Sequence, residues 1–183
     1  MNLPRGRFRT VYLDPPWNFK TYSAAGDGRS ANQHYDCMNF AAIKALPVPD
    51  LLEPDSVVLM WVTDPMLEKG MELLNHWGLK FKTVGFYWTK LNADGSPFTG
   101  MGYWTRANPE QCWLATKGSP SRVHKDVRRW ISSPRREHSR KPDEIYERIE
   151  RLVPGPYLEM FARTERPGWT SWGNQVTKFA STV

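Results

Sequence analysis

The fold and the chemistry of this chain are decided at Val11-Tyr12-Leu13-Asp14-Pro15-Pro16-Trp17, where a short apolar run ends in an acid, two prolines and an indole. The apolar run predicts a strand, and the prolines, which fix φ and donate no N–H, predict where it ends. The Asp14 carboxylate can hold or deprotonate a donor, and the Pro15 carbonyl is a second acceptor. The Trp17 ring can stack on a nucleobase, a contact worth roughly 1–3 kcal/mol. Methylation of an amine on a flat base needs such a set, although Asp-Pro-Pro can also simply turn a chain above a core tryptophan.

Composition bounds the possibilities. With 183 residues, 40% hydrophobic and 24% charged, the chain is expected to form one globular domain over residues 1–183. Cys37 and Cys112 lie far apart, and neither they nor the four histidines show the spacing of metal ligands. No signal peptide or membrane-spanning run is present. We therefore expect a reduced, cytoplasmic protein without a metal.

Nine tryptophans are many for this length. Trp61, Trp77 and Trp113 have apolar neighbours and are expected in the core. Five further tryptophans stand among Gly, Pro, Arg and Thr, where surfaces for stacking are plausible. They are Trp17, Trp104, Trp130, Trp169 and Trp172.

The positive charge is concentrated in one segment. Of the net +6, residues 117–141 carry nine Lys or Arg against two acids, which makes that segment +7 and the remainder −1. A neutral body with one basic segment indicates a polyanionic partner, although a solvated loop can have the same composition. We expect the segment to hold nucleic-acid phosphates through Arg135, Arg136, His138, Arg140 and Lys141.

The order of elements predicts an α/β fold. Strands are predicted at residues 10–13, 56–63, 83–89, 111–116 and 157–163. The run at 56–62 is apolar throughout, as expected for a strand covered on both faces. Asp64-Pro65 predicts a helix N-cap and first turn, and Gly78 its end. Pro142 predicts the start of a second helix, with Ile145, Ile149 and Leu152 facing inward.

Three stretches have loop composition. They span residues 18–36, 92–109 and 117–141. Long loops in a compact domain are usually functional or disordered. Beside an Asp-Pro-Pro-Trp motif, they predict a lid and a substrate surface.

Four segments in order carry a family resemblance. They are residues 13–17, residues 110–118, His138-Ser139-Arg140-Lys141-Pro142-Asp143-Glu144-Ile145-Tyr146, and residues 159–163 followed by 169–175. The set resembles the S-adenosylmethionine-dependent adenine methyltransferases related to the catalytic subunit of the eukaryotic messenger-RNA adenosine methyltransferase, and the similar short DNA adenine methyltransferases of bacteria and phages. The resemblance covers residues 10–176. It implies a Rossmann-like fold in permuted order, in which the catalytic strand comes first, with a mostly parallel sheet and helices on both faces.

The resemblance also implies roles for single residues. Asp14 is similar to the acid that contacts both cofactor and target amine, with Pro15 as backbone acceptor, Pro16 as the rigid continuation and Trp17 as the base-stacking wall. Tyr35 is similar to a loop tyrosine over the active site.

For the cofactor S-adenosylmethionine, Lys117 resembles the lysine that reaches the methionine carboxylate or a nearby phosphate. Phe161 and Arg163 resemble cofactor-pocket residues, and Asn174 with Gln175 resembles the pair that holds ribose and adenine. Ala162 stands where close relatives usually have glycine, and Glu165-Arg166 where eukaryotic relatives have His-Asn, so ribose contacts from those two positions are not implied.

The function expected is transfer of a methyl group to the N6 amine of adenine. A short self-contained chain favours DNA as the substrate, in a monomer or homodimer of a bacterial or phage-encoded enzyme. RNA adenosine methylation, a non-catalytic partner subunit, and glutamine or cytosine methylation remain as alternatives.

Overall fold

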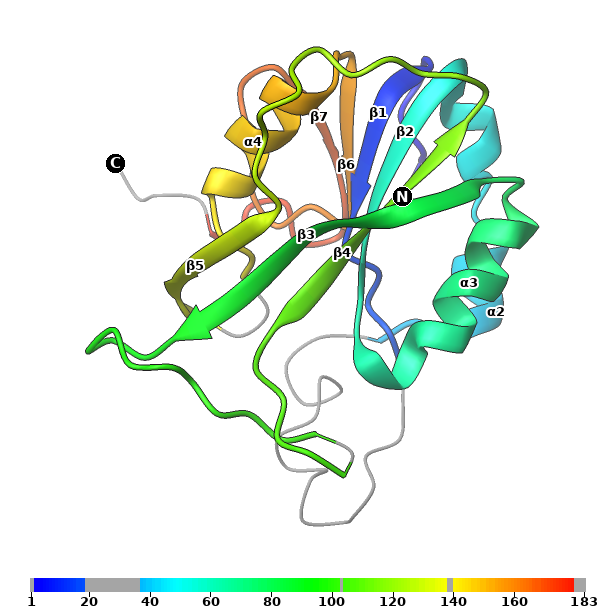
Figure 1. Ribbon diagram of the computed structural model, residues 1–183. Coiled ribbons are helices and arrows are strands. Elements are labelled where there is room, and N and C mark those ends of the chain that lie inside the picture. The colour runs from blue at the N-terminus through cyan, green and yellow to red at the C-terminus, as the bar shows by residue number, and fades with distance from the viewer. Residues whose placement is uncertain (1, 19–36, 103, 138–139, 180–183) are drawn as a thin grey trace.

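The computed structural model describes residues 2–18, 37–102, 104–137 and 140–179. These residues form one seven-stranded sheet in the order β5-β3-β4-β2-β1-β6-β7 (Figure 1). The strands are β1 (Phe8–Leu13), β2 (Leu52–Val62), β3 (Lys80–Leu91), β4 (Glu110–Lys117), β5 (Trp130–Pro134), β6 (Tyr157–Met160) and β7 (Trp169–Trp172). No helix in this part of the chain is long and apolar enough to cross a bilayer.

The sheet is mostly parallel, as predicted. β1 pairs in parallel with β2 and β6, β6 with β7, and β3 with β5. β4 runs antiparallel to both of its neighbours, β2 and β3. The five predicted strands are all present with shifted ends, whereas β5 and β7 were not predicted. β5 lies inside residues 117–141, so the expectation of a continuous loop there is wrong.

Two hydrophobic clusters cover the two faces of the sheet. Val58, Met60 and Val62 of β2 belong to the cluster that contains the helix α3 residues Leu73 and Leu74. Val57, Leu59 and Trp61 belong to the other cluster, with Ile145 and Ile149 of helix α4. Because side chains alternate along a strand, an all-apolar sequence is what a strand buried on both faces requires.

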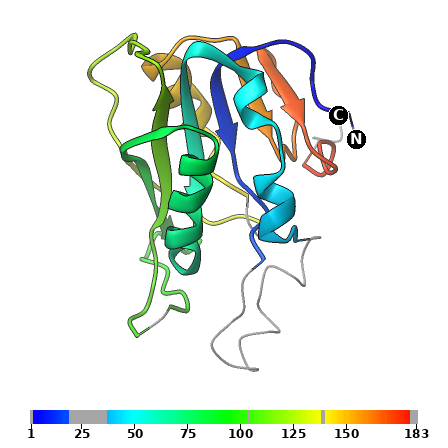
Figure 2. The same cartoon turned by 90° about the vertical axis from the view of Figure 1, so that its right-hand side faces the viewer.

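Helices lie on both sides of the sheet, as Figures 1 and 2 show. α2 (Phe40–Lys44) and α3 (Leu67–His76) cover one face, and α4 (Glu144–Leu152) covers the other. A 3₁₀ turn, η2 (Val48–Leu51), leads from α2 into β2.

The start of α3 differs from the prediction. Asp64 and Pro65 form a 3₁₀ turn, η3 (Asp64–Met66), and the N-cap of α3 is Met66, which makes no side-chain capping bond. The predicted end is confirmed, since Gly78 follows at φ +68°. α4 begins close to where Pro142 predicts it, and Asp143 is its N-cap.

The connections define one edge of the sheet as the place for a ligand. All strands except β4 end at that edge, which we call the carboxyl edge. Leu13 at the end of β1 pairs there with Met60 of β2 and Met160 of β6. The antiparallel β4 begins at the same edge, with Glu110 opposite Trp88. The β1-to-β2 connection carries α2 on one face, and α4, which precedes β6, lies on the other. The fold therefore switches faces between β1 and β6, the position where α/β sheets bind ligands.

Candidate active site

Asp14 follows β1 at this switch point and belongs to a chain of alternating charges. Its Oδ2 lies 2.8 Å from Nζ of Lys141, and the same ammonium lies 3.2 Å from Oε2 of Glu110. Lys90 binds the other oxygen of Glu110 at 2.5 Å. The two carboxylates and two ammonium groups together are neutral. Because a half-buried charge is costly without a partner of opposite sign, this pairing lets all four charges remain at the site. Asp14 retains 23% exposure, so its carboxylate can still be reached from solvent.

The network keeps Glu110 and Lys141 ionised. Burial alone would raise the pKa of Glu110, but the ammonium groups of Lys141 and Lys90 outweigh burial and lower that pKa from 4.5 to about 2. Burial would lower the pKa of Lys141, whereas the carboxylates of Asp14 and Glu110 outweigh it and raise that pKa above its ordinary value. Lys141 also lies 5.2 Å from the ring centre of Trp61. An ionised lysine is thus fixed beside Asp14.

The two prolines hold the chain in a tight conformation after Asp14. The Trp17 N–H donates to the Pro15 carbonyl at 2.7 Å, and the Met38 N–H donates to the Pro16 carbonyl at 3.0 Å. An isolated bridge between Trp17 and Met38 completes this clasp. A carbonyl oxygen has two lone pairs, so Pro15 can accept one more hydrogen bond, as the predicted second acceptor must.

Trp17 lies in the core and does not form the predicted stacking wall. Its side chain is 3% exposed, and its indole N–H donates to the Trp61 carbonyl at 3.0 Å. The ring is buried in the cluster under α3, so no base can stack on Trp17 in this conformation. Its effect on the site is to anchor the clasp. Trp169 is also buried, whereas Trp104 and Trp130 are exposed as predicted.

The turn after β6 lies next to the end of β1, and the turn after β7 contacts it closely. Phe161 adopts φ +63°, a left-handed conformation that is uncommon for a side chain of this size. The Ala162 N–H donates to the Trp172 carbonyl at 3.0 Å. A Cβ atom on Gly173 would lie 2.6 Å from the Ala162 carbonyl oxygen, so only glycine permits this approach.

The predicted cofactor residues other than Lys117 are brought to this edge. Phe161 and Arg163 follow β6, and Asn174 and Gln175 follow β7, whose last residue pairs with Met160. Asn174 is exposed and Gln175 is half-buried, with Lys178 bound to its side-chain oxygen at 3.3 Å. Their assignment to a cofactor stays a prediction.

Lys117 lies at the opposite edge of the sheet. It ends β4 opposite Ser56, which precedes the partner of Thr10 near the start of β1, and its ammonium donates to the Pro49 carbonyl at 3.1 Å. Since β4 is antiparallel, its last residue is remote from the end of β1. This position contradicts the prediction that Lys117 acts beside Asp14, and the lysine found there is Lys141.

The basic segment is likewise divided between the two edges, and most of its predicted phosphate ligands have other partners. Arg136 binds Asp143 at 2.6 Å, and Arg140 binds Glu137 at 3.3 Å. Arg135 stacks on Phe98, 4.3 Å from its ring centre. Lys141, at 11% exposure, is bound to Asp14 and Glu110, so its prediction as a phosphate ligand is wrong in this structure. Tyr35 and His138 lie outside the described residues.

Glu110 and Lys90 are the site residues that the sequence analysis did not single out. Glu110 opens β4 and Lys90 is near the end of β3, so the antiparallel pairing of Trp88 with Glu110 brings them to the carboxyl edge. An acid at a strand start carries no distinctive signal in one sequence. Among the described residues, no group of three or more His, Cys, Asp or Glu side chains could hold a metal ion.

A second buried acid lies behind Asp14 on the α4 face. Both carboxylate oxygens of Glu159 accept hydrogen bonds from the Tyr146 hydroxyl, at 3.0 and 3.1 Å, and the residue is 8% exposed. Burial, reinforced by the charge of Asp14, raises the pKa of Glu159 from 4.5 to about 7, against a smaller lowering by Tyr146. Glu159 therefore titrates near neutral pH.

Glu159→Gln should remove a pH dependence of stability. The folded pKa lies above the unfolded value, so the free energy of unfolding is greatest below about pH 4.5 and falls as pH rises through 7. The full cost of ionisation is about 3 kcal/mol. Urea unfolding at pH 5 and pH 8 should show the variant gaining stability relative to the parent by about 2–3 kcal/mol at the higher pH. A constant difference between the two proteins across this range would contradict the assignment.

Comparison with known proteins gives the family of the chain. The MT-A70 family model matches residues 8–175. The Type II methyltransferase M.MunI of Mycoplasma sp is 28% identical over 95% of this chain and 80% of its own length. The N(6)-adenosine-methyltransferase MT-A70-like protein of Arabidopsis thaliana is 35% identical over 93% of this chain but 24% of its own.

The human N(6)-adenosine-methyltransferase catalytic subunit METTL3 is 33% identical over 93% of this chain and 28% of its own length. The chain thus spans about a quarter of these two eukaryotic relatives and most of the mycoplasmal one. The family match extends from the first residue of β1 past the end of β7, and so includes Asp14, Glu110, Lys141 and both turns of the carboxyl edge. The chain belongs to the MT-A70 family.

Proposed function

We propose that the chain transfers a methyl group from S-adenosylmethionine to the exocyclic N6 amine of adenine in DNA, in the cytoplasm of a bacterial or phage-infected cell. The observation that carries the proposal is the reachable Asp14 carboxylate, fixed by Lys141 at the switch point between β1 and β6. The similarity to the Type II methyltransferase M.MunI over most of its length supports DNA. The eukaryotic relatives support RNA as the second candidate substrate.

The residues at the carboxyl edge fit S-adenosylmethionine. That molecule carries hydroxyl, amine, carboxylate and purine groups, which need both donors and acceptors. The carboxamides of Asn174 and Gln175 offer both, Arg163 and Lys141 offer positive charge, and Asp14 offers negative charge. The turns at Phe161 and Gly173 stand at the ends of adjacent parallel strands, where nucleoside-like ligands of α/β proteins bind.

The chain would act by positioning and electrostatics. When bound, S-adenosylmethionine supplies an electrophilic methyl group on a sulfonium. The Asp14 carboxylate and the Pro15 carbonyl accept hydrogen bonds from the two N–H groups of the target amine. This orients the nitrogen lone pair, which is otherwise delocalised into the purine ring, toward the methyl group. Asp14 is also the acceptor nearest to the proton that the methylated nitrogen must lose.

Lys141 positions Asp14 for this task. Its ammonium fixes one oxygen of Asp14, while Glu110 and Lys90 fix the ammonium in turn. The second Asp14 oxygen is the one assigned to the amine. Because a paired adenine is out of reach within a duplex, the target must be flipped out or unpaired before it can meet Asp14.

The proposal is tested by methylation of matched oligonucleotides. Purified protein is given labelled S-adenosylmethionine with DNA and RNA of the same sequence, each as a single strand and as a duplex, and the product nucleoside is identified by mass spectrometry. We expect N6-methyladenine in DNA. Methyladenosine in RNA alone would establish the second candidate. Oligonucleotide binding without methylation or S-adenosylmethionine binding would instead indicate a non-catalytic subunit.

A further inference from the structure

Four strands place side chains at one level on the sheet face that carries α3. Val62 of β2 pairs with Gln111 of β4, Gln111 with Tyr87 of β3, and Tyr87 with Trp130 of β5. Partners at one level of a sheet point to the same face. α3 covers only the Val62 end of this row, where Gly70 packs against it. Tyr87 and Trp130 are 36% and 65% exposed, so the row ends in two neighbouring aromatic side chains open to solvent.

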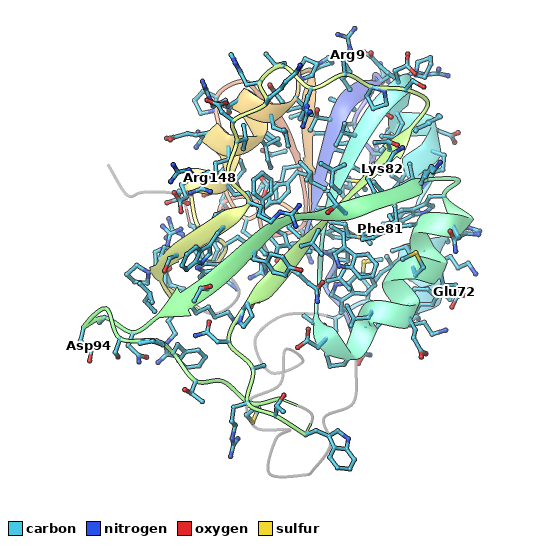
Figure 3. The ribbon with its side chains drawn as sticks, viewed as in Figure 1. Arg9, Glu72, Phe81, Lys82, Asp94 and Arg148 are labelled. Atoms are coloured by element: carbon cyan, nitrogen blue, oxygen red, sulfur yellow. The ribbon has the colours of Figure 1, made fainter. Side chains whose placement is uncertain are left out.

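Trp130 is held in place on this face. Its indole N–H donates to the Thr89 hydroxyl at 3.0 Å, which lays the ring along β3. From the α4 side, the Arg148 guanidinium donates to the carbonyls of Trp130 at 2.7 Å and Arg128 at 2.6 Å. Figure 3 shows Arg148 between α4 and β5. The ring is thus held by one hydrogen bond on a backbone that Arg148 fixes, and an indole held in this way loses less entropy when a ligand stacks on it.

A hollow adjoins the exposed Tyr87. Its volume is about 270 Å³, and Asp64, Arg106 and Gln111 contribute polar groups to its lining. The Gln111 amide is oriented, because its oxygen accepts from Trp113 at 2.8 Å and its nitrogen donates to Asp64 at 3.3 Å. An acid, an amide and a guanidinium beside an aromatic ring can bind the edge and face of a nucleobase together.

The charges around the row select a polyanion. Arg136, Arg140, Arg148, Arg151 and Arg166 all form ion pairs with acids. By contrast, Arg106, Arg128 and Arg129 form no ion pair with any acid in the described parts of the chain, and they flank the hollow and Trp130. Arginines without an acid partner beside exposed aromatic rings are a combination that binds single-stranded nucleic acid.

The row is also next to the candidate active site. Gln111 follows Glu110 directly, and successive residues of a strand point to opposite faces, so Glu110 faces Lys141 and Asp14 while Gln111 faces the hollow. A nucleic-acid strand that crosses the carboxyl edge can therefore present one base to Asp14 and its neighbours to the other face.

We propose that Tyr87, Trp130 and the adjoining hollow bind unpaired nucleotides that flank the target adenine. This inference rests on the proposed function, since it names the second part of the substrate surface. Tyr87 and Trp130 stack on the bases, the hollow holds one base edge, and Arg106, Arg128 and Arg129 attract the phosphates.

The test measures binding of fluorescently labelled single-stranded DNA and RNA by anisotropy. Tyr87→Ala and Trp130→Ala should each weaken binding of single strands by about 5- to 100-fold. Tyr87→Phe and Trp130→Phe keep a ring and should retain most of the affinity. Val123→Ala is the matched control, because Val123 is 53% exposed and its N–H is bonded to the end of α4, away from the row. In methylation assays, the alanine variants should raise KM for the oligonucleotide with little change in kcat.

Unchanged single-strand affinity in the Tyr87→Ala, Trp130→Ala double variant overturns this proposal. A second result would also overturn it: the parent protein sediments as a dimer, the double variant sediments as a monomer, and oligonucleotide binding is the same in both. The face would then be an interface between two copies of the chain. A parent protein that binds single strands through these rings but methylates nothing supports the surface and rejects the proposed function. If the parent protein methylates and the alanine variants keep its KM for the oligonucleotide, the proposed function is supported and the surface is rejected.

Discussion

Asp14→Asn is expected to reduce methyl transfer by about 10²- to 10⁴-fold, the range found when a positioned acid or base is removed. Asparagine keeps the size of the side chain and one acceptor oxygen, but it carries no charge. It therefore has only one oxygen to accept hydrogen bonds from both the target amine and Lys141. Asp14→Ala should be at least as damaging. Because Asp14 is 23% exposed at a strand end, neither change should unfold the chain.

The measurement is the single-turnover rate with S-adenosylmethionine and oligonucleotide both saturating. Circular dichroism and urea unfolding check that the variants fold. Asp126→Asn is the matched control, since Asp126 is also an acid paired with a basic residue, Arg151, but in the segment between β4 and β5, before the chain reaches the carboxyl edge. A rate within about threefold of the parent in folded Asp14→Asn would remove Asp14 from the role proposed for it.

Lys141→Met should cost both activity and stability, whereas Lys117→Met should cost neither. Removing Lys141 leaves the carboxylates of Asp14 and Glu110 without the ammonium that joins them, and breaking a buried ion pair from one side costs about 3–5 kcal/mol. Asp14 also loses the contact that fixes its position, so we expect the rate to fall by about 10²- to 10³-fold.

The two lysine variants form a direct comparison of sequence and structure. Lys117 was predicted from the motif near Gly118, whereas Lys141 is the lysine that contacts Asp14. Rates are measured as for Asp14→Asn, and stability by urea unfolding near pH 7. Adding Asp14→Asn to Lys141→Met should restore part of the stability, since it removes the carboxylate that loses its partner, whereas Glu110 keeps its ion pair with Lys90. Loss of methyl transfer in Lys117→Met with a normal rate in Lys141→Met would reject the site described here.

The sequence was sufficient for the features that depend on local pattern. The apolar run before Asp14 predicted β1, the continuous apolar run at 56–62 predicted a strand between two helical layers, and Pro142 predicted the start of α4. Because the carboxyl ends of parallel strands meet at one edge, the position of Arg163 at the same edge as Asp14 also followed from the permuted order that the family resemblance implied.

The features that failed depend on long-range pairing. Asp14 and Lys141 are 127 positions apart, and nothing near either residue reveals the other. The direction of β4 decides that Glu110 rather than Lys117 lies at the carboxyl edge. The sequence of a single strand does not show whether it runs parallel or antiparallel to its neighbours. Trp17 and Trp130 have similar polar neighbours in the sequence, yet one is 3% and the other 65% exposed, because tertiary packing alone determines which indole is covered.

The clasp that joins Pro16 and Trp17 to Met38 separates the catalytic strand from what is inserted after it. Residues 17 and 38 are tied to each other in the folded core, so the positions at which the intervening segment begins and ends are fixed by contacts outside it. A change in the length of that segment therefore need not move Asp14, and target preference and chemical centre can be varied separately.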